Sequence, residues 1–285
     1  MEKIQQAVER AKGVSGEQLR PVMTPQAATV PPEPATMPKT ASRGARTKQL
    51  SSGSVFNEVN VSLEVLEQNR IVAHNAADPR SRAFDMLRTQ VLQAMDKQDW
   101  QFLAVTSPTL GCGKSVTAIN LALSIARQPD RSALLVDMDL QRPSIANYLG
   151  IRAKEGLCNV LEGKIPLATA LFRTNVDGNE VMVLPAESST VHSSALIGSR
   201  ATGALLENIR QEFKGRTVIF DMPPLLQGDE VLALLPKIDC VLLVTAAGVS
   251  TQHQIVECNK HLQSTEVVRL VLNKASQTAA TPCYY

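Results

Sequence analysis

A short run of small, polar and basic residues, at positions 107–115, follows an apolar segment and precedes a helical pattern. Gly111 and Gly113 lack a Cβ, so the backbone N–H groups of this loop can curl around phosphate oxygens. Lys114 would reach the outer phosphates of a nucleotide, and Ser115 would offer its hydroxyl to Mg²⁺. A strand, a glycine-containing loop and a helix N-terminus, in this order, indicate a nucleotide-binding site.

The match to the usual G-x-x-x-x-G-K-[ST] spacing is partial, because Pro108 stands where that pattern has its first glycine. A glycine turn that opens an ordinary helix would explain Gly111 and Gly113 but not the Lys-Ser pair that follows them. The loop therefore predicts nucleotide binding by six consecutive residues: Gly111, Cys112, Gly113, Lys114, Ser115 and Val116.

Acidic residues end two further apolar segments. Asp137 and Asp139 follow the run that begins at Ala133, and Asp221 follows the run that begins at Thr217. The carboxyl ends of strands gather at one edge of an open α/β sheet, where ligands bind. Three carboxylates at that edge would repel one another unless a cation lay among them, and Mg²⁺ prefers such oxygen ligands. A cap or turn role would explain one aspartate well but all three poorly.

The elements that position these residues alternate along the chain. The sequence predicts strands at Phe102–Thr106, Ala133–Asp137, Val181–Leu184, Thr217–Asp221, Cys240–Val244 and Val267–Leu272. It predicts helices at Ser115–Arg127, Gly203–Phe213, Asp229–Leu235 and Gln252–Leu262, and one before the first strand around Phe84, Leu87, Val91 and Leu92. Short buried strands separated by helices favour a doubly wound α/β domain with a mostly parallel sheet.

The composition divides the chain into four parts. Residues 1–12 have the spacing of a short amphipathic helix, and residues 13–75 form a proline-rich and basic stretch that predicts a disordered linker. The nucleotide-binding domain is expected at residues 76–275. Residues 276–285 are expected to form a flexible tail that ends in Tyr284 and Tyr285.

The whole composition excludes several classes of protein. A net charge of +2 over 285 residues gives no bias toward nucleic acid, and the basic stretch lacks the interleaved aromatic residues of such binders. No apolar run approaches the roughly 18 residues of a membrane-spanning helix, and residues 1–5 show no apolar signal core. The five cysteines show no paired spacing, which indicates free thiols in a reducing compartment. We therefore expect a cytoplasmic protein without a transmembrane segment.

Taken together, the motifs resemble those of the bacterial tyrosine kinases of exopolysaccharide export, which are built on a Walker-type P-loop ATPase fold. The short N-terminus is similar to that of the stand-alone autokinases of exosortase-associated polysaccharide clusters. The resemblance covers residues 80–285 and rests on these segments: 111–115 (GCGKS), 117–123 (TAINLAL), 134–143 (LLVDMDLQRP), 220–224 (FDMPP) and 270–274 (LVLNK).

This resemblance implies ATP and Mg²⁺ as cofactors and a transfer of phosphate to tyrosine. Lys114 would then hold the phosphates, and Asp137 would accept the proton of the tyrosine. The resemblance implies metal contacts, direct or through water, by Ser115, Asp139 and Asp221, a nucleobase contact by Asn273, and Tyr284 and Tyr285 as phosphoacceptors. A carboxylate suits the proton transfer because a phenol with a pKa near 10 must lose its proton at neutral pH.

The resemblance also implies a membrane-embedded polysaccharide co-polymerase as activating partner, which would recruit the chain to the inner face of the cell membrane. Self-association is implied by a family helix with the pattern Glu-x-x-Arg-x-x-Arg. Here that helix reads Arg82, Asp85 and Arg88, so two of its charges are reversed. Leu110 and Cys112 replace the usual proline and glutamate of the loop, and Gln141 replaces an arginine of the second motif.

Two alternative functions remain open from the sequence. A positioning or partitioning ATPase of the same fold usually carries a signature lysine where this chain has Thr109, and it has no need of terminal tyrosines. An accessory protein of polysaccharide export could bind nucleotide without transferring phosphate. The leading prediction is an ATP-dependent protein-tyrosine autokinase that regulates exopolysaccharide synthesis or export.

Overall fold

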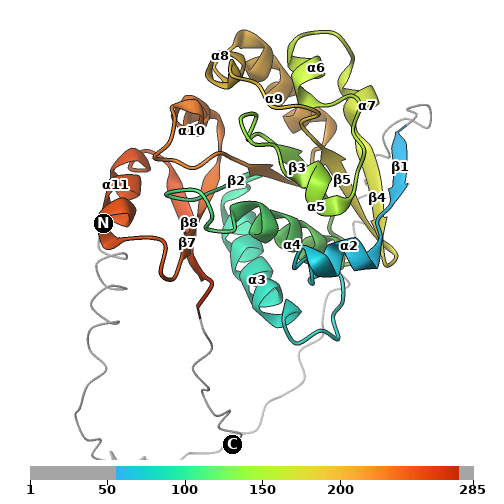
Figure 1. Cartoon of the computed structure of the whole chain (residues 1–285), viewed down its shortest axis with the longest axis horizontal. Coiled ribbons are helices and arrows are strands. Elements are labelled where there is room, and N and C mark those ends of the chain that lie inside the picture. Colours follow the sequence, from blue (N-terminus) through green and yellow to red (C-terminus); the bar gives the residue numbers. More distant parts are fainter. Residues whose placement is uncertain (1–55, 276–285) are drawn as a thin grey trace, which may run out of the picture. The chain divides into compact units, whose positions relative to one another are not determined.

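A computed structural model describes residues 56–275, and this part of the chain contains an eight-stranded sheet (Figure 1). The strands lie in the order β1-β4-β5-β3-β6-β2-β7-β8. Their bounds are β1 (Asn57–Asn60), β2 (Phe102–Thr106), β3 (Ala133–Asp137), β4 (Phe172–Val176), β5 (Asn179–Leu184), β6 (Thr217–Asp221), β7 (Cys240–Ala246) and β8 (Glu266–Asn273).

The sheet is mostly parallel, as the sequence predicts. Strands β5, β3, β6, β2, β7 and β8 all run in the same direction. The exception is at one edge, where β4 pairs antiparallel with β5 and β1 pairs parallel with β4. The phosphate-loop strand β2 lies inside the sheet, between β6 and β7.

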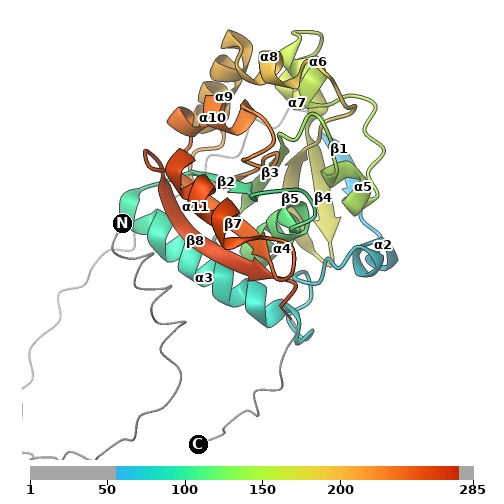
Figure 2. The ribbon, with the colours of Figure 1, turned by 60° about the vertical axis from the view of Figure 1, so that its left-hand side comes forward.

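Helices cover both faces of the sheet (Figure 2). One face packs against α2 (Leu63–Gln68), α3 (Ser81–Gln98), α4 (Lys114–Ala126) and α5 (Ile145–Leu149). The other packs against α6 (Leu157–Leu161), α7 (Leu167–Ala170), α8 (Ser193–Ile197), α9 (Arg200–Glu212), α10 (Glu230–Leu234) and α11 (Gln252–His261). A single-turn 3₁₀ helix at Leu235–Lys237 follows α10. Two hydrophobic cores therefore lie on opposite faces of the sheet.

The central strands are buried along their whole length. Every residue of β2, β3, β6 and β7 is buried, which accounts for their uninterrupted apolar sequences. Phe102 and Phe220 of neighbouring strands form an edge-to-face pair with ring centroids 5.1 Å apart. Hydrophobic packing on both faces thus holds in place the strand ends that carry the acidic residues.

The folded domain begins earlier than residue 76, the boundary that the sequence suggests. Strand β1 and helix α2 belong to the domain, and Leu66 and Ile71 are fully buried. The side chain of Asn120 in α4 accepts hydrogen bonds from the backbone N–H groups of Val72 at 2.8 Å and Ala73 at 2.9 Å. The expected helix at residues 1–12, most of the linker at 13–75 and the tail at 276–285 lie outside the described residues.

Within residues 56–275, no helix is long and apolar enough to cross a membrane. The four cysteines of this part, Cys112, Cys158, Cys240 and Cys258, are buried free thiols. Cys283 lies outside it.

Candidate active site

The loop between β2 and α4 takes the shape that its glycines permit. Gly111 and Gly113 have φ angles of 76° and 90°, in the left-handed region that residues with a Cβ rarely adopt. Gly113 precedes the first turn of α4, and its carbonyl accepts hydrogen bonds from the backbone N–H (3.0 Å) and hydroxyl (2.9 Å) of Thr117. The first N–H groups of α4 have no partner within the helix and carry its positive dipole end, so this loop can bind an anion.

The acidic residues meet at the same edge of the sheet because their strands are neighbours. Asp137 at the end of β3 is the register partner of Asp221 at the end of β6. Asp221 in turn pairs with Val105 of β2, just before the phosphate loop. The strand order therefore brings the two acidic motifs and the loop together, as the sequence predicts.

Lys114 lies at the centre of this group. Its Nζ atom is 2.8 Å from Oδ2 of Asp139 and 3.5 Å from Oδ1 of Asp221. Burial alone would lower the pKa of Lys114, but the charges of Asp221 and Asp139 outweigh it, so its pKa is raised. The lysine is therefore charged and, in this structure, paired with the carboxylates rather than with a phosphate.

Asp221 has an oxygen that is free to bind another group. Its side chain is fully buried, and its Oδ2 atom has no hydrogen-bond partner among the described residues. The hydroxyl of Ser115 lies nearby, 3.0 Å from the hydroxyl of Ser144 and 3.4 Å from Nζ of Lys114. Burial raises the pKa of Asp221. A hard cation beside this oxygen would satisfy it, so the donor set of Ser115, Asp139 and Asp221 fits Mg²⁺.

Asp137 has a second role that the sequence did not reveal, as an anchor for the segment between β3 and α5. Its Oδ2 atom accepts hydrogen bonds from the backbone N–H groups of Ser144 (2.9 Å) and Ile145 (3.0 Å), and its Oδ1 atom accepts one from Asp139 (3.3 Å). Burial, followed by the charge of Asp221, raises the pKa of Asp137 to about 7. Asp137 thus fixes the segment that carries Asp139.

Asn273, at the end of β8, lies against the back of the phosphate loop. Its side-chain amide donates a hydrogen bond of 2.9 Å to the carbonyl of Cys112. The Cys112 thiol is buried and lies 3.4 Å from the hydroxyl of Ser250. The structure thus shows Asn273 as a support of the loop, and its predicted contact with a nucleobase stays a prediction.

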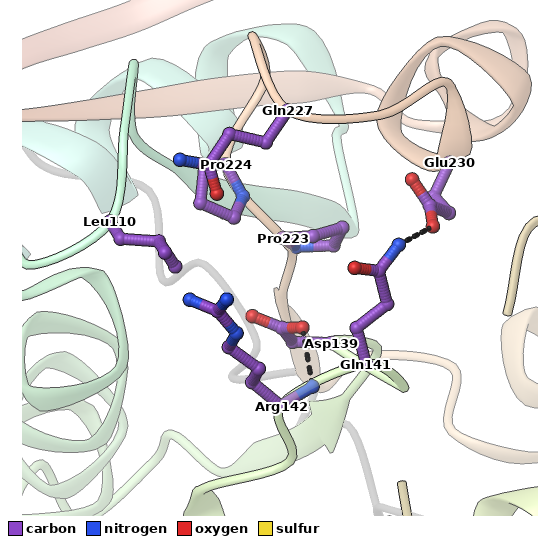
Figure 3. A pocket seen from close by; sticks show the side chains of 8 residues that line it. All are labelled: Leu110, Asp139, Gln141, Arg142, Pro223, Pro224, Gln227 and Glu230. Atoms are coloured by element: carbon purple, nitrogen blue, oxygen red, sulfur yellow. Dashed lines mark hydrogen bonds between the residues drawn. The ribbon is translucent and has the colours of Figure 1, made fainter. Parts of the chain in front are cut away.

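A small cavity of about 10 Å³, enough for one water molecule, opens beside Asp139 (Figure 3). Three segments form its walls: the phosphate loop, which contributes Leu110, the segment after β3 and the segment from β6 to α10. It is lined by Leu110, Asp139, Gln141, Arg142, Pro223, Pro224, Gln227 and Glu230. No spacing in the sequence signalled Ser144 or Glu230, because neither residue belongs to a recognisable motif. Tyr284 and Tyr285 lie outside the described residues.

In helix α3, the acidic residue that departs from the family pattern forms its contacts within the same chain. The Asp85 carboxylate contacts Arg88 of the same helix at 3.1 Å and Arg127, which follows α4, at 3.1 Å. It also accepts a hydrogen bond of 2.6 Å from the hydroxyl of Ser124. These contacts attach α3 to the helix that follows the phosphate loop.

Comparisons with known proteins indicate the family and the fold of this chain. The model of the ParA family, described as NUBPL iron-transfer P-loop NTPase, matches residues 100–278, more than half of the chain. The tyrosine-protein kinase CpsD of Streptococcus pneumoniae serotype 4 is 30% identical over 194 residues, which cover 67% of this chain and 82% of CpsD. The chain belongs to the bacterial tyrosine kinases within the ParA-like P-loop NTPases.

Other members of the kinase family match the same region. The putative tyrosine-protein kinase EpsB of Ralstonia solanacearum is 31% identical over 191 residues. This match covers 67% of the chain but only 25% of EpsB, which is a much longer protein. Among solved structures, the kinase domain of VpsO has a TM-score of 0.61 and 27% identity, with 69% of this chain and 97% of that chain covered. The fold and the family predicted from the motifs are thereby confirmed.

Proposed function

We propose that the chain is an ATP-dependent protein-tyrosine autokinase that regulates exopolysaccharide synthesis or export. In this proposal it transfers the terminal phosphoryl group of ATP to Tyr284 and Tyr285. The names of its relatives support tyrosine as the acceptor, and the site supports a nucleotide and Mg²⁺ as cofactors.

One observation carries the proposal: Lys114 is held between Asp139 and Asp221 at the mouth of the phosphate loop, beside a buried carboxylate oxygen without a partner. Phosphoryl transfer needs charge neutralisation and alignment more than covalent catalysis. A phosphate that entered the loop would offer Lys114 a new partner and release carboxylate oxygens for a cation.

Each residue then has a distinct role. The backbone N–H groups from Gly111 to Val116 bind the phosphates, and Lys114 neutralises their charge. Mg²⁺ held by Ser115, Asp139 and Asp221 would supply the positive charge that phosphoryl transfer requires. Asp137 accepts the phenol proton, because a carboxylate can take up the proton that a phenol with a pKa near 10 must lose at neutral pH.

The remaining parts of the proposal concern the surroundings of the kinase. A membrane-embedded polysaccharide co-polymerase is its activator and recruits it from the cytoplasm to the inner face of the membrane. Self-association would use contacts other than the Asp85 carboxylate, because this group is engaged within the chain.

The proposal is tested by incubating the purified full chain with Mg-ATP and probing for phosphotyrosine. We expect a signal from the wild type, none from Lys114→Met, and none from the double variant Tyr284→Phe/Tyr285→Phe. Tyr148→Phe is the matched control, because Tyr148 is the remaining tyrosine of the chain and should leave the signal unchanged.

Two results would contradict the proposal in different ways. A wild type that binds Mg-ATP but gives no phosphotyrosine, even with membranes that contain the co-polymerase, would indicate an accessory nucleotide-binding protein. A signal that survives the loss of both terminal tyrosines but not that of Tyr148 would move the acceptor site into the folded domain.

A further inference from the structure

Glu230, the first residue of helix α10, is a buried carboxylate at the edge of the candidate active site. Its exposed fraction is 2%. One of its oxygens, Oε1, accepts a hydrogen bond of 2.5 Å from the side-chain amide of Gln141 and one of 2.8 Å from the hydroxyl of Ser193. Figure 3 shows Gln141 reaching across the cavity toward Glu230, on the side away from Arg142.

Within residues 56–275, no lysine or arginine forms an ion pair with Glu230, so two neutral donors hold this acidic group. A buried carboxylate that is not paired with a cation is costly, and hydrogen bonds to the charged form offset that cost only if their geometry is maintained. The contact between Gln141 and Glu230 is therefore a directional restraint. We call Gln141, Glu230 and Ser193 the Glu230 bridge.

The Glu230 bridge joins the two segments that carry the acidic members of the proposed metal site, Asp139 and Asp221. Gln141 lies two residues after Asp139, in the segment between β3 and α5. Glu230 ends the segment that starts at Asp221 and passes through Pro223, whose carbonyl accepts a hydrogen bond of 2.7 Å from Thr106. Fixing Gln141 against Glu230 thus fixes the spacing between the two segments.

The third member of the bridge extends it to helix α8. Ser193 begins this helix, and the neighbouring Ser194 donates a hydrogen bond of 2.7 Å to Asp229. The backbone N–H of Thr190, just before α8, donates one of 2.8 Å to the carbonyl of Leu140. Helix α8 is therefore attached to both segments, and it braces the bridge from outside the site.

We propose that Glu230 is a positioning residue for phosphoryl transfer, which acts through Gln141 to hold the segment of Asp139 against the segment of Asp221. This inference rests on the proposed kinase function. Glu230 contacts neither the phosphate loop nor Lys114, so its effect falls on the alignment of the reacting groups rather than on nucleotide affinity.

The test exchanges the donor and the acceptor of the hydrogen bond between Gln141 and Glu230. Q141E places two carboxylates in contact and removes the donor. The double variant Q141E/E230Q restores an amide-to-carboxylate hydrogen bond in the opposite direction. Q211E is the matched control, because Gln211 donates a hydrogen bond of 2.9 Å to Glu207 on the exposed side of α9, so the same chemical change is made outside the bridge and the site.

We expect Q141E to lower kcat for tyrosine phosphorylation by about tenfold to a hundredfold, since misplacement of a reacting group by about 1 Å has effects of this size. The KM for ATP should stay close to that of the wild type. The double variant should recover most of kcat, and Q211E should retain it. A role limited to stability would lower the melting temperature without this split between kcat and KM.

A second measurement does not depend on kinase activity. Amide hydrogen exchange of residues 139–145 in the nucleotide-free chain should rise in Q141E and return toward the wild-type rate in Q141E/E230Q. A wild type without kinase activity would contradict the proposed function, whereas the exchange rates would still decide whether the bridge fixes this segment.

The positioning role is overturned if Q141E and Q211E behave alike in both measurements. It is also overturned if the double variant folds but recovers neither kcat nor slow exchange. Should Q141E fail to fold, S193A removes only one donor to the same oxygen. It should give a smaller fall in kcat with faster exchange at residues 139–145, and unchanged values of both would refute the role.

Discussion

Lys114 compensates the negative charge that the fold concentrates at the ends of β3 and β6. Its ammonium group contacts Asp139 and Asp221, and both carboxylates are buried. In a low-dielectric environment such charges tolerate one another only with a cation between them. The lysine therefore has a structural role in addition to the role proposed for it with phosphates.

This double role predicts that Lys114→Met destabilises the nucleotide-free chain. Removing one partner of a buried ion pair typically costs about 3–5 kcal/mol, because the remaining charges lose their compensation. Urea unfolding of the nucleotide-free protein measures the loss. The double variant K114M/D221N should regain part of it, since one of the uncompensated charges is gone. Equal unfolding free energies for the wild type and K114M would show that the carboxylates do not need the lysine.

The two loop glycines should respond differently to alanine. At Gly113 a methyl group would collide with the side-chain amide of Asn273, whereas at Gly111 it would meet no atom within 4 Å. Both positions have a positive φ, which costs an alanine about 1–2 kcal/mol. We expect G111A to weaken binding of a fluorescent ATP analogue by about fivefold to thirtyfold, which corresponds to this strain, and G113A to weaken it further.

Asn273 provides the control for this comparison. Because Asn273 also supports the loop, N273A alone is the reference: if the collision is the cause, adding G113A to N273A should lower affinity by about as much as G111A lowers that of the wild type. An equal loss of affinity in G113A with and without Asn273 would assign the effect to the backbone angle alone.

At the scale of elements, one acidic side chain, Asp85, adds an ion pair and a hydrogen bond to the apolar packing between α3 and α4. Burial alone would raise the pKa of Asp85, but hydrogen bonds from Ser124 and Arg127 outweigh this effect and lower it. A depressed pKa means that folding favours the ionised form. The stabilisation is therefore complete well above the ordinary pKa of 3.8 and is lost as the pH falls through the folded-state value.

We accordingly expect Asp85→Asn to lower the free energy of unfolding at neutral pH by about 1 kcal/mol, since the ion pairs are partly exposed to solvent. The difference from the wild type should shrink as the pH falls below 3.8. Chemical unfolding of both proteins across this pH range measures it. Asp96→Asn is a suitable control, because Asp96 pairs with Arg131 at a more exposed position. A difference for D85N that does not change with pH would exclude the charge as its cause.

The elements differ in how well the sequence predicts them, and burial explains the difference. Strands β2, β3 and β6 are predicted at their observed bounds, because strands buried on both faces are runs of mainly apolar residues, and aspartate ends β3 and β6. Strand β4 is missed, since its residues alternate between buried and exposed and include Arg173 and Asn175. Helices α5, α6 and α7 are missed because four or five residues do not display a helical period.

The candidate site, like the fold, is only partly predictable from the sequence. Its motif residues could be assigned from spacing, because a phosphate loop and acidic strand ends impose particular residue types. The anchoring role of Asp137 and the bridge from Gln141 to Glu230 could not be assigned from spacing. These contacts join segments that are separated by up to 89 residues. Such pairings depend on the strand order, which no local pattern encodes.

At the scale of the whole molecule, the described domain depends on residues ahead of its first predicted helix. Leu66 and Ile71 are fully buried, and Val72 is exposed to only 4%. The side chains of Leu66 and Ile71 belong to the core on the face of the sheet that carries α3 and α4. The same segment gives Asn120, buried within α4, its hydrogen-bond partners.

A chain that begins at residue 76 should therefore fail to fold stably, whereas one that begins at Phe56 should unfold like the full chain. Each fully buried leucine, isoleucine or valine contributes about 1.5–3 kcal/mol, so losing Leu66, Ile71 and Val72 removes an amount comparable to the 5–15 kcal/mol of a typical domain. The side-chain amide of Asn120 would in addition lose three of its four hydrogen bonds, those with Arg70, Val72 and Ala73, a further cost of about 1–3 kcal/mol. Thermal unfolding followed by circular dichroism, with and without Mg-ATP, measures both shortened chains beside the full one. A chain from residue 76 with the melting temperature of the full protein would show that the segment 56–75 lies on the domain without stabilising it.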